Sequence, residues 1–344
     1  MKAAVLHKIR HLIVEEIDVP EIKSDEVLIK VKYAGICGTD PHIYTGKFPV
    51  PNLPLVPGHE FSGEITRIGE DVTTLKEGDR VTADINISCE TCYFCRKMQK
   101  LFCPNLKQIG VHTNGAFAEY VKAPAKQIHK LPDDMLYKHG ACVEPLACAI
   151  HGMERGNVQV GNSVVIIGAG PMGLMHLQLA RLRGAYPVII TELSDYRLEK
   201  AEELGADYVI DASKVDVKKK VKDLTDGRGS DVVIEAVGSL STYEQAFGIV
   251  RRGGNVVAFG AAPKDAKVGI KPFDIYSQEL TITGSYAGTY ETWLEAITLI
   301  NSQRVKVDPL LTHVLSLDQI VEGYDMILEK KDKAIKILIS PEIK

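Results

Sequence analysis

Four of the seven cysteines lie close together in the sequence, as Cys89, Cys92, Cys95 and Cys103. Gaps of two residues allow successive thiolates to converge on one ion, and a longer loop returns the fourth sulfur. Four sulfur ligands with no open position are typical of a structural zinc site. An iron–sulfur cluster is the alternative, because Pro104 follows the last cysteine as in runs that hold such clusters, although their last gap is shorter.

A second motif follows the apolar run Val164–Ile167 and precedes a stretch with helical periodicity. Gly168 permits a tight turn, Gly170 lets a pyrophosphate approach the backbone, and Gly173 lets helix and strand pack closely. The amino end of a helix also offers free N–H groups to phosphate. The pattern therefore predicts a dinucleotide-binding loop, formed by Gly168, Gly170, Pro171, Met172 and Gly173.

An acidic residue, Glu192, ends the next apolar run. A carboxylate at this spacing can accept hydrogen bonds from the ribose hydroxyls, and it repels a 2′-phosphate. Leu193 adds no positive charge, so the sequence favours NAD over NADP as the cofactor. Arg197 is a further expected cofactor contact, and its charge could offset part of the repulsion.

Two kinds of element must position these motifs. The chain up to about residue 150 has short alternating runs, such as 26–32 and 61–68, between loops rich in proline and glycine, which indicates β-structure. A helix over 290–301 and short strands ending at 334–339 resemble this first part. Between them, six apolar runs mostly separated by amphipathic stretches predict a parallel sheet: 164–167, 188–191, 208–210, 232–235, 256–259 and 280–283.

We therefore predict an α/β protein with two domains. Residues 1–150 and 286–344 form a β-rich, zinc-containing domain, and residues 151–285 form a doubly wound parallel domain that binds NAD. The 344 residues are sufficient for two cores of this kind.

Composition and charge limit the classes of partner. With 41 basic and 45 acidic residues the formal net charge is −4, so nothing attracts this chain to nucleic acid or to an anionic membrane. The amino-terminal segment has no secretory signal, and no run approaches the roughly 18 apolar residues of a membrane span. We expect a cytoplasmic protein without nucleic-acid or membrane partners.

Three further segments extend the pattern: Gly35-Ile-Cys-Gly-Thr-Asp-Pro-His42, Pro57-Gly-His-Glu60 and Val143-Glu-Pro-Leu-Ala-Cys148. With the cysteine quartet and the glycine motif, they resemble the zinc-dependent medium-chain alcohol dehydrogenases, in that family's order and across essentially the whole chain. The resemblance implies a GroES-like catalytic domain beside a Rossmann domain, a catalytic zinc in addition to the structural one, and a homodimer or homotetramer.

The resemblance also implies roles for individual residues around the catalytic zinc. Cys37 and His59 would be ligands. Glu144 would take the third place, directly or through a water molecule. Glu60 would be either a ligand or an acid behind the ligands, and Asp40 would orient the imidazole of His59.

Three other residues have implied roles in proton transfer and cofactor binding. Thr39 would hydrogen-bond the substrate oxygen, and His42 would release its proton to water at neutral pH. Lys336 would lie against the pyrophosphate of the cofactor.

The segment Glu144-Pro145-Leu146 most resembles the sorbitol and polyol branch of the family. We expect hydride transfer from a secondary alcohol of a polyol, possibly phosphorylated, to NAD, which gives the ketose. The hydroxyl-reading Arg-Tyr pair of sorbitol dehydrogenases is missing after Gly284. L-threonine 3-dehydrogenase is the alternative, favoured by segments 38–44 and 291–293. A non-catalytic NAD-binding structural or regulatory protein is the alternative of another class, and the presence of the catalytic ligands disfavours it.

Overall fold

The computed structural model describes residues 1–50, 52–329, 331 and 333–343, and the chain forms two compact units. Unit 1 comprises Met1–Pro145 together with Thr289–Lys344, and unit 2 comprises Leu146–Gly288. The first boundary falls a few residues before the predicted one because helix α4 (Val143–Gly156) contains it, so the chain passes between the units within a helix.

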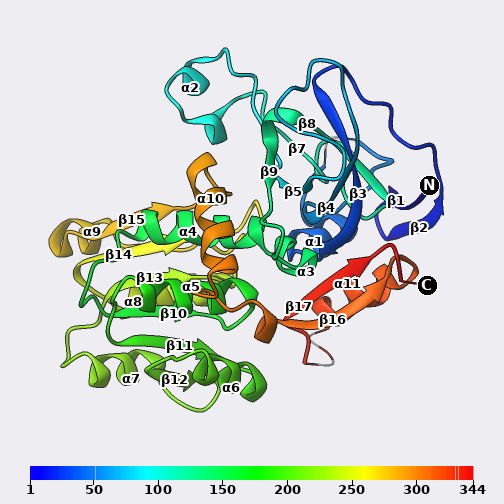
Figure 1. Cartoon of the computed structure of the whole chain (residues 1–344). Helices are drawn as coiled ribbons and strands as arrows, with labels where there is room; N and C mark the ends of the chain where they lie inside the picture. The colour runs from blue at the N-terminus through cyan, green and yellow to red at the C-terminus, as the bar shows by residue number, and fades with distance from the viewer. Residues whose placement is uncertain (51, 330, 332, 344) are drawn as a thin grey trace. The chain divides into compact units, whose positions relative to one another are not determined.

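Most of unit 1 is β-structure. Its strands are β1 (Lys2–Lys8), β2 (His11–Glu16), β3 (Glu26–Gly35), β4 (Glu60–Ile68), β5 (Arg80–Ala83), β6 (Asn86–Ile87), β7 (Lys107–Gln108), β8 (Tyr120–Pro124), β9 (Ile128–Lys130), β16 (Leu311–Ser316) and β17 (Lys336–Ser340). Seven of them form one sheet in the order β16-β17-β3-β4-β5-β9, with β8 also paired to β3 (Figure 1). The pairs β1-β2 and β6-β7 are separate small sheets.

The helices that lie wholly in unit 1 have between 4 and 12 residues. They are α1 (Thr39–Tyr44), α2 (Tyr93–Arg96), α3 (Tyr137–Gly140), α10 (Tyr290–Asn301) and α11 (Ile320–Leu328), with 3-10 turns at Lys100–Phe102, Ala125–Gln127, Asp308–Leu310 and Leu317–Gln319. The core follows from strand alternation, because Val27, Ile29 and Val31 of β3 pack in one cluster with Phe61 and Ile65 of β4.

Unit 2 is a parallel sheet with helical connections. Its elements are β10 (Val164–Ile167), α5 (Pro171–Leu182), β11 (Val188–Glu192), α6 (Asp195–Glu203), β12 (Tyr208–Asp211), α7 (Val217–Leu224), β13 (Ser230–Glu235), α8 (Leu240–Ile249), β14 (Val250–Ala258), α9 (Pro272–Gln278) and β15 (Thr281–Gly284). The strand order β12-β11-β10-β13-β14-β15 is that of a doubly wound Rossmann sheet (Figure 1). The predicted α/β class is confirmed, and each of the six apolar runs overlaps a strand.

The central strands β10 and β11 of this sheet are apolar and buried on both faces because helices cover both faces. On one face, Val165 and Val233 belong to a buried cluster with Val221 of α7 and Ala246 of α8. Helix α5 contacts β10 and β11, and it also contacts α6. No helix in the described part of the chain is long and apolar enough to cross a membrane.

One buried ion pair crosses three strands of the unit 1 sheet. Lys336 of β17 binds Glu60 of β4 through its ammonium group, and the same ammonium donates to the carbonyl of Ile36 at 3.0 Å. Both charged residues are only 1 % exposed. Burial alone would lower the pKa of Lys336, but Glu60 and Cys37 raise it, so the ammonium stays charged.

Gly35 of the intervening strand β3 makes room for this ion pair. Gly35 lies opposite Glu60 in the β3–β4 register, and Leu338 of β17 lies on its other side. A Cβ at position 35 would overlap the Glu60 carboxylate and lie 2.9 Å from Cε of Lys336. The lysine therefore reaches the glutamate only because β3 has no side chain at this point.

The ion pair predicts a specific pattern of stability changes. Lys336→Met should lower the free energy of unfolding by about 3–5 kcal/mol, because it leaves a buried carboxylate without its counter-ion. The double variant Lys336→Met/Glu60→Gln should recover a large part of this loss. Urea unfolding of the purified protein, followed by fluorescence, measures both changes.

The matched control is Lys32→Met, which removes a lysine of the same sheet that binds the more exposed Glu342 at 2.6 Å. A surface pair of this kind contributes about 0–1 kcal/mol. Equal losses in Lys336→Met and Lys32→Met would contradict the assignment of the Glu60–Lys336 pair as a buried structural contact.

Candidate metal and dinucleotide sites

The cysteine quartet of unit 1 converges as the spacing predicts. The sulfur atoms of Cys89, Cys92, Cys95 and Cys103 all lie within 4.8 Å of one another. The short helix α2 begins immediately after Cys92 and carries Cys95, while the backbone N–H of Cys89 donates to the sulfur of Cys103 at 3.4 Å. Four sulfur atoms at these separations can surround one zinc ion as tetrahedral ligands, as in a structural zinc site.

The protonation chemistry of the quartet also fits a cation. Hydrogen bonds from the backbone and side chain of Thr91 and the backbone of Cys92 lower the pKa of Cys89 to about 5. The backbone N–H of Cys95 would lower the pKa of Cys92, but partial burial and the neighbouring sulfurs raise it to about 11. Without a cation, four thiolates therefore cannot coexist here, and a bound zinc ion would replace the remaining protons.

A second group of potential ligands forms where β3 ends and β4 begins. Ligand atoms of Cys37, His59 and Glu60 lie within 4.8 Å of one another. The antiparallel register explains the meeting, because Gly35 pairs with Glu60 and so places the residues just after β3 beside those just before β4. Sulfur, imidazole and carboxylate ligands are those of a catalytic zinc site with an open position.

Asp40 lies behind this group of ligands and is fully buried. One carboxylate oxygen accepts the backbone N–H of Cys37 at 2.8 Å, and the other lies 3.5 Å from Nδ1 of His59. That second oxygen and Nδ1 of His59 are buried without a hydrogen-bond partner among the residues that the structure describes. A carboxylate in this position orients a metal-binding imidazole and increases its basicity, so the pair fits a metal held through the other ring nitrogen.

The protonation state of His59 also bears on metal binding. Burial would lower the pKa of His59, but Asp40 and Cys37 raise it well above 6.5. The imidazole must lose this proton before it can bind a metal, so binding at this site should release a proton.

The surroundings of Glu144 and Lys336 bear on the roles predicted for them as a metal ligand and a cofactor contact. Glu144 is buried in the first turn of α4, but it is outside the group formed by Cys37, His59 and Glu60, and its role as a ligand stays a prediction. Lys336 was expected against the cofactor pyrophosphate. Its ammonium is held by Glu60 and the carbonyl of Ile36, because the missing side chain of Gly35 opens that route, and its contact with a pyrophosphate stays a prediction.

Helix α1 carries the two residues expected to move the proton. Thr39 and His42 are one helical turn apart, and the hydroxyl of Thr39 lies 3.7 Å from the sulfur of Cys37. Burial and the charge of Lys47 lower the pKa of His42 from 6.5. His42 is therefore neutral at pH 7 and can accept a proton.

The glycine motif of unit 2 lies between β10 and α5, at the carboxyl end of β10. Gly168 has φ +98°, which favours glycine, and a Cβ on Gly173 would overlap the carbonyl oxygen of Gly168. Gly170 is the N-cap of α5, where a Cβ would lie 3.9 Å from Nη1 of Arg197, and Pro171 begins the helix. Since β10 lies between β11 and β13, the loop occupies the point where strand order reverses, which is where such sheets bind dinucleotides.

Glu192 lies directly beside this loop. Its carboxylate accepts hydrogen bonds from the backbone N–H groups of Ala169 at 2.9 Å and Leu193 at 2.6 Å. Arg197 approaches the same carboxylate at 3.9 Å. The structure thus brings both predicted residues to the glycine loop, together with a partial compensation of charge.

Glu235 is a residue of this region that sequence reasoning missed. It ends β13 and is fully buried, and its carboxylate accepts the N–H groups of Val237 at 3.0 Å and Gly238 at 2.9 Å. It therefore fixes the loop after β13, which neighbours the glycine loop after β10 at the point where strand order reverses. An acid directly after a fully apolar run is the sequence signal that could have identified it.

Comparisons with known proteins agree with this geometry. Residues 23–133 match the family model of the alcohol dehydrogenase GroES-like domain, and residues 171–302 match that of the zinc-binding dehydrogenases. The chain is 38 % identical to sorbitol dehydrogenase of Halalkalibacterium halodurans over 99 % of both chains. It is 35 % identical to D-arabitol-phosphate dehydrogenase of Enterococcus avium, over 95 % of this chain and 94 % of that one.

Other relatives differ in substrate and cofactor. L-threonine 3-dehydrogenase of Pyrococcus horikoshii is 38 % identical over 94 % of both chains. A zinc-binding dehydrogenase from Sinorhizobium meliloti, solved with NADP, is 36 % identical with a TM-score of 0.93 over 99 % of both chains. An alcohol dehydrogenase from E. coli CFT073, solved with NADH, is 29 % identical with a TM-score of 0.92 over 99 % of both chains.

The two family models, the identity to relatives over nearly the full length, and the paired ligand groups lead to one assignment. This chain belongs to the zinc-dependent medium-chain alcohol dehydrogenase family and is an oxidoreductase that acts on CH–OH groups with a nicotinamide cofactor and zinc.

Proposed function

We propose that this protein oxidises a secondary alcohol of a polyol to the ketose and transfers the hydride to NAD. The meeting of Cys37, His59 and Glu60 within 4.8 Å carries the proposal, because it supplies the ligands of a catalytic metal next to a buried orienting acid. The sorbitol and D-arabitol-phosphate relatives support the polyol class, and the second supports a phosphorylated substrate as a candidate.

The proposed mechanism assigns one task to each side chain. When bound, zinc would act as a Lewis acid on the alcohol oxygen, and the nicotinamide would accept the hydride. Cys37, His59 and Glu60 would hold the metal, with Glu144 as a further candidate ligand. The hydroxyl of Thr39 hydrogen-bonds the substrate oxygen, and neutral His42 takes up the proton for release to water.

L-threonine 3-dehydrogenase activity is the second candidate, since a relative with that name has the same identity as the sorbitol enzyme. The segment Glu291–Trp293 gives it less support than the sequence suggested. Trp293 is fully buried and stacks on His129 with ring centroids 5.6 Å apart, so it serves the core of unit 1. Its presence therefore does not discriminate between the two substrates.

The proposal also covers the metal content, oligomeric state and location of the protein. We propose one catalytic and one structural zinc ion per chain and a homodimer or homotetramer, as the family resemblance implies, and a cytoplasmic location. Sedimentation of the purified protein and metal analysis test these points.

A substrate panel provides the direct test. Sugar alcohols, sugar-alcohol phosphates, simple secondary alcohols and L-threonine are each offered with NAD, and reduced cofactor is followed by absorbance. We expect the highest kcat/KM with a polyol or its phosphate. A chelator should abolish this activity by removing the metal at the open site, and added zinc should restore it.

Other outcomes of the panel decide between the alternatives. The highest kcat/KM with L-threonine would replace the polyol proposal by the second candidate. No reduction of cofactor with any alcohol, by protein that holds both zinc ions, would favour the non-catalytic alternative.

Glu192 should set the choice of cofactor. Glu192→Ala removes the ribose acceptor and the repulsion of a 2′-phosphate, so kcat/KM with NAD should fall by about ten- to a hundredfold while use of NADP improves. Asp195→Ala is the control, because it removes an equal charge from the exposed first turn of α6 and should leave the NAD/NADP ratio within about twofold. Wild-type preference for NADP would contradict the role given to Glu192.

His42 should determine the pH dependence of turnover. The proposed relay needs neutral His42, whose pKa is lowered from 6.5, so wild-type kcat should fall only at more acid pH. In His42→Gln we expect kcat to fall by about tenfold or more at pH 7 and to recover as hydroxide increases at higher pH. The exposed His11→Gln is the control and should keep the wild-type profile. An unchanged profile in His42→Gln, measured where hydride transfer limits the rate, would remove His42 from the relay.

A further inference from the structure

A basic cavity lies in unit 2 at the amino-terminal end of the parallel strands, and the glycine loop lies at their carboxyl end. The cavity has a volume of about 790 Å³ and is bordered by residues that precede or begin β13, β14 and β15. The glycine loop follows the carboxyl end of β10, so in this parallel sheet the two sites are at opposite strand ends. Six cationic side chains line the cavity against the single acid Asp274: Lys218, Lys222, Arg228, Arg251, Arg252 and Lys271.

Most of these cations have no acidic partner. Lys218, Lys222, Arg252 and Lys271 form no ion pair within 4.0 Å with any residue that the structure describes. Lys218 and Lys222 are also one turn apart on α7, a spacing at which like charges destabilise a helix. Four uncompensated cations around one cavity therefore repel each other, and a bound anion would relieve this repulsion.

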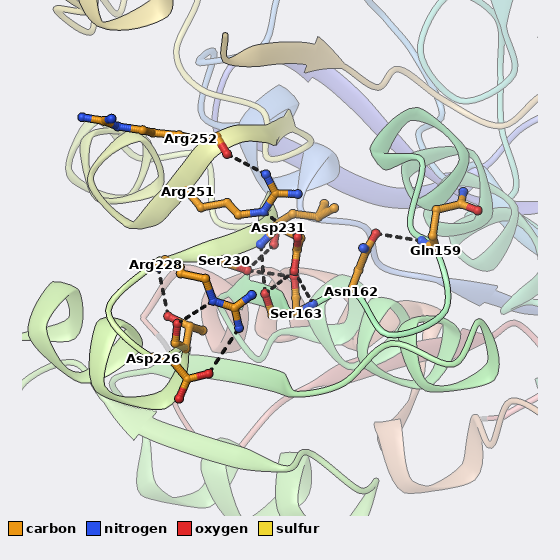
Figure 2. Close-up of polar contacts among 12 residues, drawn as sticks. Gln159, Asn162, Ser163, Asp226, Arg228, Ser230, Asp231, Arg251 and Arg252 are labelled. Carbon is orange, nitrogen blue, oxygen red and sulfur yellow. Dashed lines mark hydrogen bonds and ion pairs between the residues drawn. The ribbon is translucent and has the colours of Figure 1, made fainter. Parts of the chain in front are cut away.

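Arg251 is held in place by a network of polar contacts. Figure 2 shows its guanidinium between Asp231 and the carbonyl of Arg252, with Nε 2.5 Å from Asp231 and Nη1 2.5 Å from that carbonyl. Asp231 is fixed in turn by the backbone N–H of Ser163 at 2.8 Å and its hydroxyl at 2.6 Å. Nη2 of Arg251 has no acceptor in the described chain, so a rigid guanidinium keeps a free donor.

A second arginine is restrained in a similar way. Nε of Arg228 donates to the carbonyl of Thr225 at 3.2 Å, and Nη2 lies 3.3 Å from the exposed carboxylate of Asp226 (Figure 2). Guanidinium groups fixed by their surroundings are well suited to bind phosphate, because little side-chain freedom is lost when the ligand is bound.

We propose that this cavity is a second ligand site, which binds a multiply charged phosphate compound of about nucleotide size. The volume lies within the roughly 300–1,000 Å³ of small-molecule sites. Phe247, Ile270 and Leu280 give the lining an apolar part that suits the organic portion of such a ligand. The cations converge on a cavity within a chain of net charge −4, which favours a compact anion over a long nucleic acid.

Binding of phosphate compounds to the zinc-loaded protein tests this site. Excess NADH is present throughout, so that the glycine loop is occupied. Sodium tripolyphosphate and ATP are titrated by calorimetry at about 0.15 M salt, with zinc content checked before and after. We expect saturable binding of both, with a Kd below about 1 mM.

Two matched variants of α7 locate the binding. Lys218→Gln/Lys222→Gln should weaken binding at least about tenfold, because it removes two charges from the cavity wall. Lys219→Gln/Lys220→Gln removes two exposed lysines of the same helix that do not line the cavity, and it should change Kd by less than about twofold. All four lysines are exposed, so neither variant should disturb the fold.

Each outcome separates the sources of affinity. Tighter binding of ATP than of tripolyphosphate would support a ligand whose organic part enters the cavity, and equal affinity would support recognition of the phosphates alone. Absence of saturation below about 1 mM, equal losses in the two variants, or stronger competition by a single-stranded oligonucleotide would each overturn the proposal.

Discussion

The buried ion pair of Glu60 and Lys336 is the constraint on which the proposed metal site of unit 1 depends. A charge removed from water is tolerated only with a close partner and further hydrogen bonds, and here the partner comes from a strand 276 residues away in the sequence. Gly35 must lack a side chain for the two to meet. The same register places Cys37 beside His59, so one local arrangement fixes both the proposed metal ligands and the charge around them.

In unit 2, the predicted dinucleotide loop is shaped by backbone geometry and not by a buried ion pair. The turn at Gly168 and the close packing at Gly173 need the absence of side chains, while Glu192 and Glu235 use their carboxylates to hold backbone N–H groups. The two acids restrain loops on neighbouring strand ends around the point where strand order reverses. A rigid loop of this kind binds a dinucleotide without having to order its own backbone first.

The features that could be predicted from the sequence are those with local signals. The apolar runs are clearest for β10 and β11, because strands buried on both faces carry no polar alternation, and the cysteine quartet follows from spacing alone. The contact between Lys336 and Glu60 could not be predicted from spacing. It depends on which strand lies between β17 and β4, and on the absence of a side chain at Gly35 of that strand. Glu60 and Glu144 both follow motif residues, and only the β3–β4 register distinguishes the one that joins Cys37 and His59.

The order of strands in unit 1 has a consequence for folding during synthesis. All the sheet partners of β10 to β15 lie within unit 2, so this unit can fold as soon as its own continuous stretch has left the ribosome. The sheet of unit 1 must wait, since β17 lies between β16 and β3 and is made after both. Until then Glu60 lacks its lysine, and Ala34 and Gly35 at the carboxyl end of β3 lack the strand that pairs with them beside Cys37 and His59. Binding of the proposed catalytic metal is therefore expected to be a late event, completed after unit 2 has formed.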